Sequence, residues 1–284
     1  MHDLSTDLKA DAILSLMDDP SLSVRDALIA ELTRMGSSQA KPLLKRAMTQ
    51  DDELAYAAEQ IWETLYGISP EKQFERYITE YSFDLETSFL VMSQIYNPDL
   101  ETYRVITQLD DIADIITPQL FVDQNDWDKC RIISRVIFKE FGFGLNKIDP
   151  QHPCNWYLSE VLRNRSGVPL SLAVLYVLVA LRCRVDLELI RLPSCVMIAC
   201  FSEGIPLYID PVEQGTFRSQ GELMNLLYAG HTLPKAEYFA PVSIAQILIH
   251  CCRELSLQYR LRNNTEKAAL FNNYLRLFEA RNLF

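Results

Sequence analysis

Residues 167–210 read GVPLSLAVLYVLVALRCRVDLELIRLPSCVMIACFSEGIPLYID, and two patterns follow one another in this stretch. Its first part, Leu172–Leu181, is almost wholly apolar, which is typical of a helix buried on all sides. Three short β-like runs come next, with Glu203-Gly204 as a turn signal between the last two. The runs are Leu187–Leu192, Val196–Phe201 and Pro206–Ile209. A buried helix followed by an antiparallel meander predicts an α+β core.

The sequence on both sides of this core has the period of helices. Residues 7–67 carry apolar side chains at helical spacing, with Ser23 as a candidate N-cap and Gly36 and Gly67 as stops. Further stripes cover residues 70–145, with 118–128 as the main loop, and residues 243–260 and 265–281 predict a final helical hairpin. We therefore expect a predominantly helical α+β protein.

The first helices resemble one known repeat. Asp18-Asp19-Pro20, followed by Val24-Arg25 and then Ala27, is similar to the turn and second helix of a HEAT repeat. Only two helix pairs are visible, whereas isolated repeats need about three units for stability. A generic helical cap explains the same pattern, so both interpretations stay open.

Composition and charge exclude some functions and predict a compartment. The chain has 284 residues with 49% hydrophobic residues and a net charge of −11, so it can bury a large core. An acidic surface repels phosphate backbones, which argues against nucleic-acid binding and favours a basic protein partner. The start of the chain lacks a basic segment leading into an apolar one, and Val168–Leu181 is shorter than the ~20 residues that span a bilayer. We expect a cytoplasmic protein without a membrane segment.

The cysteine and histidine patterns predict neither disulfides nor a metal site. Seven cysteines stand at irregular spacing without a CxxC pair, and no histidine lies at ligand spacing from a cysteine. The cysteines are Cys130, Cys154, Cys183, Cys195, Cys200, Cys251 and Cys252. We expect reduced thiols, no metal and no cofactor.

Several short motifs between residues 141 and 215 are in register with one known family. They are Phe141-Gly142-Phe143 with Asn146, Asn155-Trp156-Tyr157-Leu158 with Val161-Leu162, Arg165 with Gly167-Val168-Pro169 and Leu172, Leu175-Tyr176, Leu192-Pro193, and Ile209-Asp210-Pro211 with Gly215. In order and spacing the chain resembles the bacterial SirB-type transglutaminase-like family over about residues 80–220. The final hairpin, with Tyr259 and Lys267-Ala268-Ala269, resembles the tetratricopeptide-like tail of many members.

The resemblance implies three segments and a divergent transglutaminase core, related to cysteine peptidases. The segments are a HEAT-like helical region at 1–67, the transglutaminase-like core with its leading helices at 68–240, and a tetratricopeptide-like hairpin at 241–284. The motif residues Asn155, Tyr157, Arg165, Gly167, Pro169, Asp210, Pro211 and Gly215 are expected to be structural.

Active transglutaminases use a Cys at the start of the buried helix, a His on the first following strand and an Asp on the next strand. The Cys position, two residues after Gly167, is Pro169 in this chain. The His position, in Pro193-Ser194-Cys195, is Cys195, and only Asp210 remains. A thiol has too high a pKa to replace an imidazole as a general base near pH 7. We therefore expect no catalytic residues.

Three residues remain as weak candidates, each with a structural alternative. Ser171 could act as a nucleophile if His152 or His231 supplied a base, but a small buried residue that lets helix and sheet approach is the simpler interpretation. Cys195 could be a redox or metal-binding thiol, although Cys200 would point to the opposite face of a strand. Asp210 either caps a turn or holds a polar ligand.

Three functions are compatible with these observations. The first is a non-catalytic transglutaminase-like protein that acts in protein–protein interaction or regulation. The second is a cysteine-peptidase or acyltransferase-type enzyme with a displaced triad. The third is a small-ligand binding module that uses the old cleft, which requires an open pocket near Asp210, Ser171 and Cys195. The first explains both the missing His and the added helices, and the sequence leaves the oligomeric state open.

Overall fold

The computed structural model describes residues 10–19, 21–50, 52–80, 83–121, 123–193, 195–202 and 204–281. The chain divides into two compact units, unit 1 (Met1–Gln73) and unit 2 (Phe74–Phe284). Each unit has a hydrophobic core of its own. The division falls shortly after the boundary predicted at residue 67.

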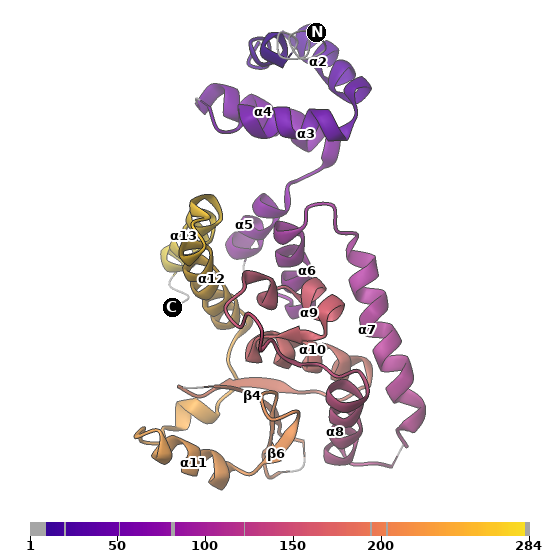
Figure 1. Ribbon diagram of the computed structural model, residues 1–284, viewed down its shortest axis with the longest axis vertical. Coiled ribbons are helices and arrows are strands. Elements are labelled where there is room, and N and C mark those ends of the chain that lie inside the picture. The colour runs from indigo at the N-terminus through magenta and orange to yellow at the C-terminus, as the bar shows by residue number, and fades with distance from the viewer. Residues whose placement is uncertain are drawn as a thin grey trace. The chain divides into compact units, whose positions relative to one another are not determined.

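Unit 1 consists of helices around a small core (Figure 1). After a helical turn at 10–14, the helices are α2 (Leu22–Met35), α3 (Ser37–Ala47) and α4 (Asp52–Tyr66). Leu32, Leu44 and Ile61 are fully buried at their centre. Gly36 ends α2 with a φ of 80°, as predicted, but the N-cap is Ser21 and not Ser23. The residues before 10, and Pro20 of the predicted turn, lie outside the described residues.

Unit 2 contains the remaining helices, two short sheets and three 3-10 turns. Its helices are α5 (Pro70–Glu80), which starts just before the division, α6 (Leu85–Tyr96), α7 (Thr102–Ile116), α8 (Asp126–Ser134), α9 (Leu158–Asn164), α10 (Pro169–Arg182), α11 (Gln220–Ala229), α12 (Ile244–Leu261) and α13 (Thr265–Ala280). The 3-10 turns are η1 (Thr117–Gln119), η3 (Pro153–Trp156) and η4 (Ala236–Phe239), and a π-helical segment, η2 (Arg135–Glu140), continues α8.

The main sheet is a four-stranded antiparallel meander. Its strands, in spatial as in chain order, are β3 (Glu188–Arg191), β4 (Val196–Cys200), β5 (Leu207–Asp210) and β6 (Thr216–Arg218). The first three match the predicted runs, whereas β6 was not expected. A second, parallel pair, β1 (Gly144–Leu145) with β2 (Ser166–Gly167), was not expected either.

The buried helix α10 packs on one face of this sheet, and α11 covers the other (Figure 1). Ile198 and Ile209 point into the main core with α10, while Met197 and Tyr208 point to Leu223 of α11. Alternation along the strands produces these two faces. The predicted fold class, predominantly helical with a buried helix on a small antiparallel sheet, is confirmed.

The terminal helical hairpin shares the core of unit 2. The rings of Phe74 in α5 and Tyr274 in α13 have their centroids 4.9 Å apart, and Tyr259 of α12 stacks on Phe271 at 5.9 Å. The described part of the segment predicted at 241–284 is therefore packed together with the helices that precede the sheet. Among the described residues, no helix combines the length and the hydropathy that crossing a membrane requires.

Candidate functional site

The start of α10, where transglutaminases carry their nucleophile, is tightly packed. β2 leads into the helix through Val168, and Pro169 is its first residue. Pro suits this position because its missing N–H has no partner in the first turn anyway. A Cβ on Gly167 would lie 2.4 Å from the Ser171 hydroxyl and 3.0 Å from Val161. Only Gly fits there, and the side chain at the nucleophile position is the pyrrolidine ring of Pro169.

Ser171 is a buried helix-capping residue. Its side chain is 1% exposed. Its hydroxyl accepts a hydrogen bond from the Val168 N–H at 3.0 Å and lies 2.7 Å from the Asn155 carbonyl, to which it donates. The proton that a general base would remove is thus bound to a backbone carbonyl, so the structure gives Ser171 a structural role.

Cys195 lies in the turn between β3 and β4. The backbone of Leu192 and Cys195 closes this turn, with Leu192 N–H donating to the Cys195 carbonyl at 2.9 Å. Ser194, between them, lies outside the described residues. The half-buried Cys195 lines a cavity of about 210 Å³. The other lining residues are Trp156, Val168, Pro169, Leu170, Arg191, Leu192, Pro193, Val196 and His250.

His250 of α12 is the residue of this cavity that the sequence analysis missed. Its Nδ1 is buried without a hydrogen-bond partner among the described residues. Burial, together with Arg191 and Arg253, lowers its pKa to about 4, so the imidazole is neutral at pH 7. No spacing rule links it to Cys195, because the two residues come to line one cavity only through the packing of α12 onto the core. The sequence signal was limited to a histidine within an apolar helical stripe.

Asp210, at the end of β5, is engaged on both carboxylate oxygens. Oδ1 accepts from the backbone N–H groups of Val212 and Glu213 at 3.0 and 3.2 Å. Oδ2 accepts from Nε of Arg218 at 3.1 Å, and the carboxylate is buried. Of the two roles left open by the sequence, the structure shows the turn cap. It does not bring Asp210 or Ser171 into the cavity of Cys195.

Two further motif residues connect loops and helices. The side-chain amide of Asn155 donates to the carbonyls of Asp149 and Pro150, and its oxygen accepts from Asn146. The hydroxyl of the fully buried Tyr157 lies 2.9 Å from that of Tyr259 in α12. These contacts assign Asn155 and Tyr157 to the framework.

Arg165 and Gly215 occupy backbone conformations that the fold requires. Arg165 ends α9 with a φ of 51°, and its guanidinium donates to the Phe141 carbonyl at 3.2 Å. Gly215 has a φ of 75°, and a Cβ there would lie 2.7 Å from the Ser134 hydroxyl. The turn that starts at Pro211 therefore packs directly on the helix formed by α8 and η2.

The remaining thiols and acids form no evident reactive centre. Burial and nearby Glu160 raise the pKa of Cys154, which keeps this thiol protonated. Hydrogen bonding from Cys130 and Ser202 lowers the pKa of Cys200 to about 6, yet its side chain is fully buried. In the part of the chain that the structure describes, no three His, Cys, Asp or Glu side chains are grouped as metal ligands would be.

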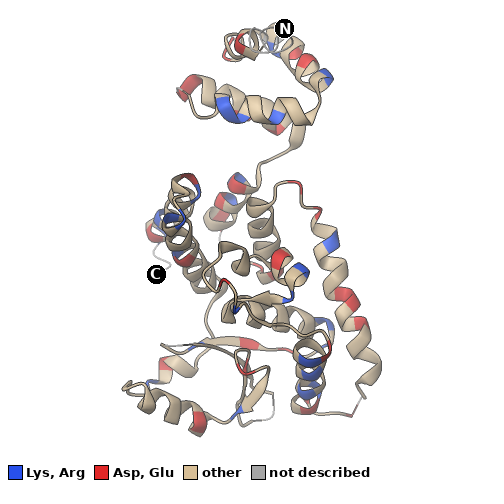
Figure 2. Ribbon diagram, in the orientation of Figure 1, with Lys and Arg blue, Asp and Glu red and all other residues tan. Residues whose placement is uncertain are grey.

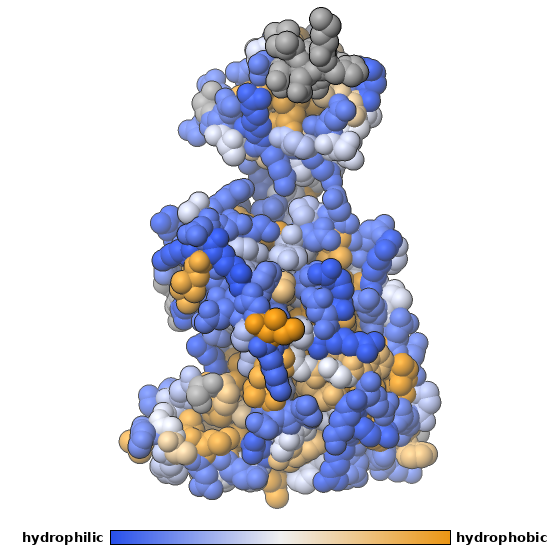
Figure 3. Space-filling view, in the orientation of Figure 1, coloured by the Kyte–Doolittle hydropathy of each residue, from blue (hydrophilic) through white to orange (hydrophobic). Residues whose placement is uncertain are grey.

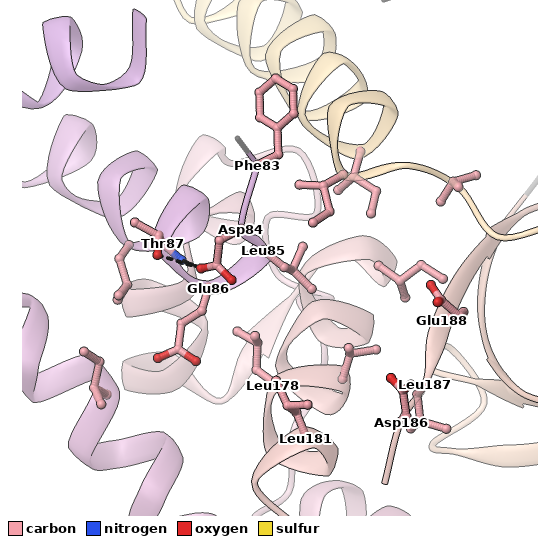
Figure 4. A pocket seen from close by; sticks show the side chains of 17 residues that line it. Phe83, Asp84, Leu85, Glu86, Thr87, Leu178, Leu181, Asp186, Leu187 and Glu188 are labelled. Carbon is pink, nitrogen blue, oxygen red and sulfur yellow. Dashed lines mark hydrogen bonds between the residues drawn. The ribbon is translucent and has the colours of Figure 1, made fainter. Parts of the chain in front are cut away.

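Two larger hollows lie on the surface of unit 2. One, of about 900 Å³, lies between α8 with η2 and the turn at 212–217. Lys and Arg residues are frequent along α8 (Figure 2). The other, of about 530 Å³, is an apolar groove beside α10, between α6 and β3 (Figure 4). Elsewhere on the face in view, separate apolar patches lie between hydrophilic stretches (Figure 3).

Comparison with known proteins gives one family. A family model described as transglutaminase-like superfamily matches residues 103–253. A UPF0162 protein of Xylella fastidiosa strain 9a5c is 25% identical over 192 residues, which cover 65% of this chain and 68% of that protein. F-box only protein 21 of Mus musculus is 36% identical over 62 residues, 22% of this chain and 10% of that protein. No solved structure matches the chain. Because the family model spans more than half of the sequence and the whole region around α10 and its sheet, the chain belongs to the transglutaminase-like superfamily.

Proposed function

We propose that this chain is a non-catalytic, SirB-type transglutaminase-like protein that acts in the cytoplasm by binding a basic protein partner. The observation that carries the proposal is Pro169 at the nucleophile position, since a pyrrolidine ring cannot attack an acyl carbon. The HEAT-like helices at 1–67 and the tetratricopeptide-like hairpin at 241–284 would add binding surface, as helical repeats do.

Two further observations support a function without chemistry. Asp210, at the position that the resemblance assigns to the triad Asp, binds Arg218 and the amides of a turn, and no histidine among the described residues is hydrogen-bonded to it. The cavity beside Cys195, at about 210 Å³, is smaller than the roughly 300–1,000 Å³ of ligand pockets. A small-ligand module in the old cleft therefore has less support than a protein-binding surface.

A cysteine-based acyl transfer is the second candidate, because Cys195 and His250 line one cavity. In this reaction the Cys195 sulfur would attack the acyl carbon of an amide or ester while His250 took the thiol proton. The bond from that carbon to its amine or alcohol leaving group would then break, and His250 would pass the proton to the leaving group. The lowered pKa of His250 makes it a weak base at neutral pH. We therefore place this candidate second.

Covalent labelling separates the two candidates. The native protein is treated near pH 7 with iodoacetamide and, separately, with a fluorophosphonate, and adducts are mapped by mass spectrometry. We expect Ser171, Cys195 and Cys154 to react more slowly in the folded protein than in the urea-unfolded protein. Faster reaction of Cys195 in the folded state, abolished by His250→Gln, would establish the second candidate and refute the first.

A further inference from the structure

The apolar groove of unit 2 lies at the C-terminal end of α10, whereas Pro169 and Ser171 lie at its start. Its walls are the start of α6, the end of α10, the first residues of β3 and the segment 242–247 that leads into α12. We call the α6 side and the β3 side of the groove its two banks. Leu178 and Leu181 lie between them (Figure 4). Leu181 is 59% exposed although it belongs to the otherwise buried helix. The groove thus presents apolar side chains to whatever enters it.

Both banks of this groove carry carboxylates. Asp84 and Glu86 lie on the α6 side, and Asp186 and Glu188 lie opposite them at β3 (Figure 4). No Lys, Arg or His is among the described residues that line the groove. The charge of the lining is therefore purely negative.

The two banks differ in how their charges are compensated. Glu86 pairs with Arg182, with Oε2 2.8 Å from Nη1, and Asp84 caps α6 by accepting from the Thr87 N–H. Neither Asp186 nor Glu188 has an ion-pair partner within the described residues. Partial burial and the neighbouring Asp186 both disfavour the charged form of Glu188 and raise its pKa. A cation placed here would relieve this repulsion.

We propose that this groove binds a segment of a partner protein that inserts apolar side chains between the banks and places Lys or Arg against Asp186 and Glu188. The inference deepens the proposed function and rests on it. The volume of about 530 Å³ holds a few side chains and not a whole helix, so the occupant is the apolar face of a segment lying along the groove. The net charge of −11 favours the approach of such a basic segment.

The test uses the full chain and a synthetic probe. The probe is a fluorescent amphipathic peptide of Leu and Lys with one Gln, and its acidic counterpart replaces each Lys with Glu. Fluorescence anisotropy measures binding to the wild type, to Asp186→Asn/Glu188→Gln, and to Leu181→Ser. We expect the Leu/Lys peptide to bind the wild type, and the double variant to bind roughly tenfold more weakly, because two rim ion pairs are lost.

A matched variant controls for overall charge. Asp111→Asn/Asp114→Asn removes the same number of charges from exposed positions of α7 outside the groove, and we expect less than about a twofold effect. Circular dichroism confirms that each variant is folded. Equal weakening by both pairs, an unchanged affinity in Leu181→Ser, equal binding of the acidic peptide, or no binding of the Leu/Lys peptide would each overturn the groove as the site.

The same samples distinguish a failure of this proposal from a failure of the proposed function. Mass spectrometry of the recovered peptide reports any reaction at its Gln or Lys side chains. A modified peptide would refute the non-catalytic function whatever its affinity. An unmodified peptide that binds elsewhere, or not at all, would overturn the groove as the binding site. It would not contradict the proposed non-catalytic function.

Discussion

Gly167 shows how closely the chain is packed at the start of α10. We expect Gly167→Ala to lower the free energy of unfolding by about 1–3 kcal/mol, as overpacking does, because its Cβ would meet the Ser171 hydroxyl at 2.4 Å. Gly144→Ala, in the neighbouring strand, is the control, since a Cβ there meets nothing within 4 Å. Urea unfolding of both variants measures the difference. Equal destabilisation of the two variants would show that the close contact at Gly167 is not the cause of the loss.

His250 makes stability depend on pH. Its pKa is about 4 in the folded protein, against about 6.5 in an unfolded chain. Between these values the unfolded state binds the proton and the folded state does not, so stability is complete above about pH 6.5 and falls as the pH drops towards 4. With allowance for partial exposure, the loss is about 1–2 kcal/mol. Urea unfolding at several pH values should show this slope, and His250→Gln should flatten it.

At the level of single residues, the sequence predicted where a residue lies in its element better than which residues it contacts. Pro169 begins α10 and Asp210 ends β5, whereas Cys195 lies in the turn between β3 and β4. The turn cap of Asp210 was foreseen as one of two roles, because Asp at the end of a strand has backbone amides within reach. The sequence analysis missed His250 because its place in the cavity of Cys195 depends on how α12 packs onto the core. Such packing leaves no local pattern in the sequence.

Elements with a strong period were predictable, whereas very short ones were not. α10 and strands β3 to β5 follow from apolar runs that only a buried helix or a half-buried strand explains. β6 has three residues, and β1 and β2 have two each, too few for any alternation to appear. These short strands form because backbone groups of a neighbouring strand pair with theirs. The neighbouring strand is in place only once the core has assembled.

The contact between the start of α9 and α12 can be tested by a double-mutant cycle on Tyr157, the N-cap of α9, and Tyr259. Each single Tyr→Phe change leaves the other hydroxyl without its partner at 2.9 Å, which should lower the free energy of unfolding by about 1–2 kcal/mol. Changing both removes the buried polar pair, so the double variant should lose clearly less than the sum. Strict additivity in urea unfolding would mean that the two hydroxyls do not interact.

At the scale of the whole chain, two cores imply two folding units. Unit 1 and unit 2 bury separate clusters, and the terminal hairpin contributes Phe271 and Tyr274 to the second. We expect a fragment of residues 68–284 to unfold cooperatively in urea with native-like circular dichroism. A fragment of residues 68–240, which lacks the hairpin, should be unfolded or molten, because aromatic side chains fully buried in the core are missing. A stable 68–240 fragment would show that the hairpin is an independent appendage.

Pro169 also limits what descendants of this sequence can become. A Cys–His–Asp arrangement at these positions would require a thiol at 169, an imidazole at 195 and release of Asp210 from Arg218. The first two would disturb a well-packed helix start and turn, and the third would leave a buried charge uncompensated. Selection acting on single substitutions therefore meets a cost at each step before any benefit.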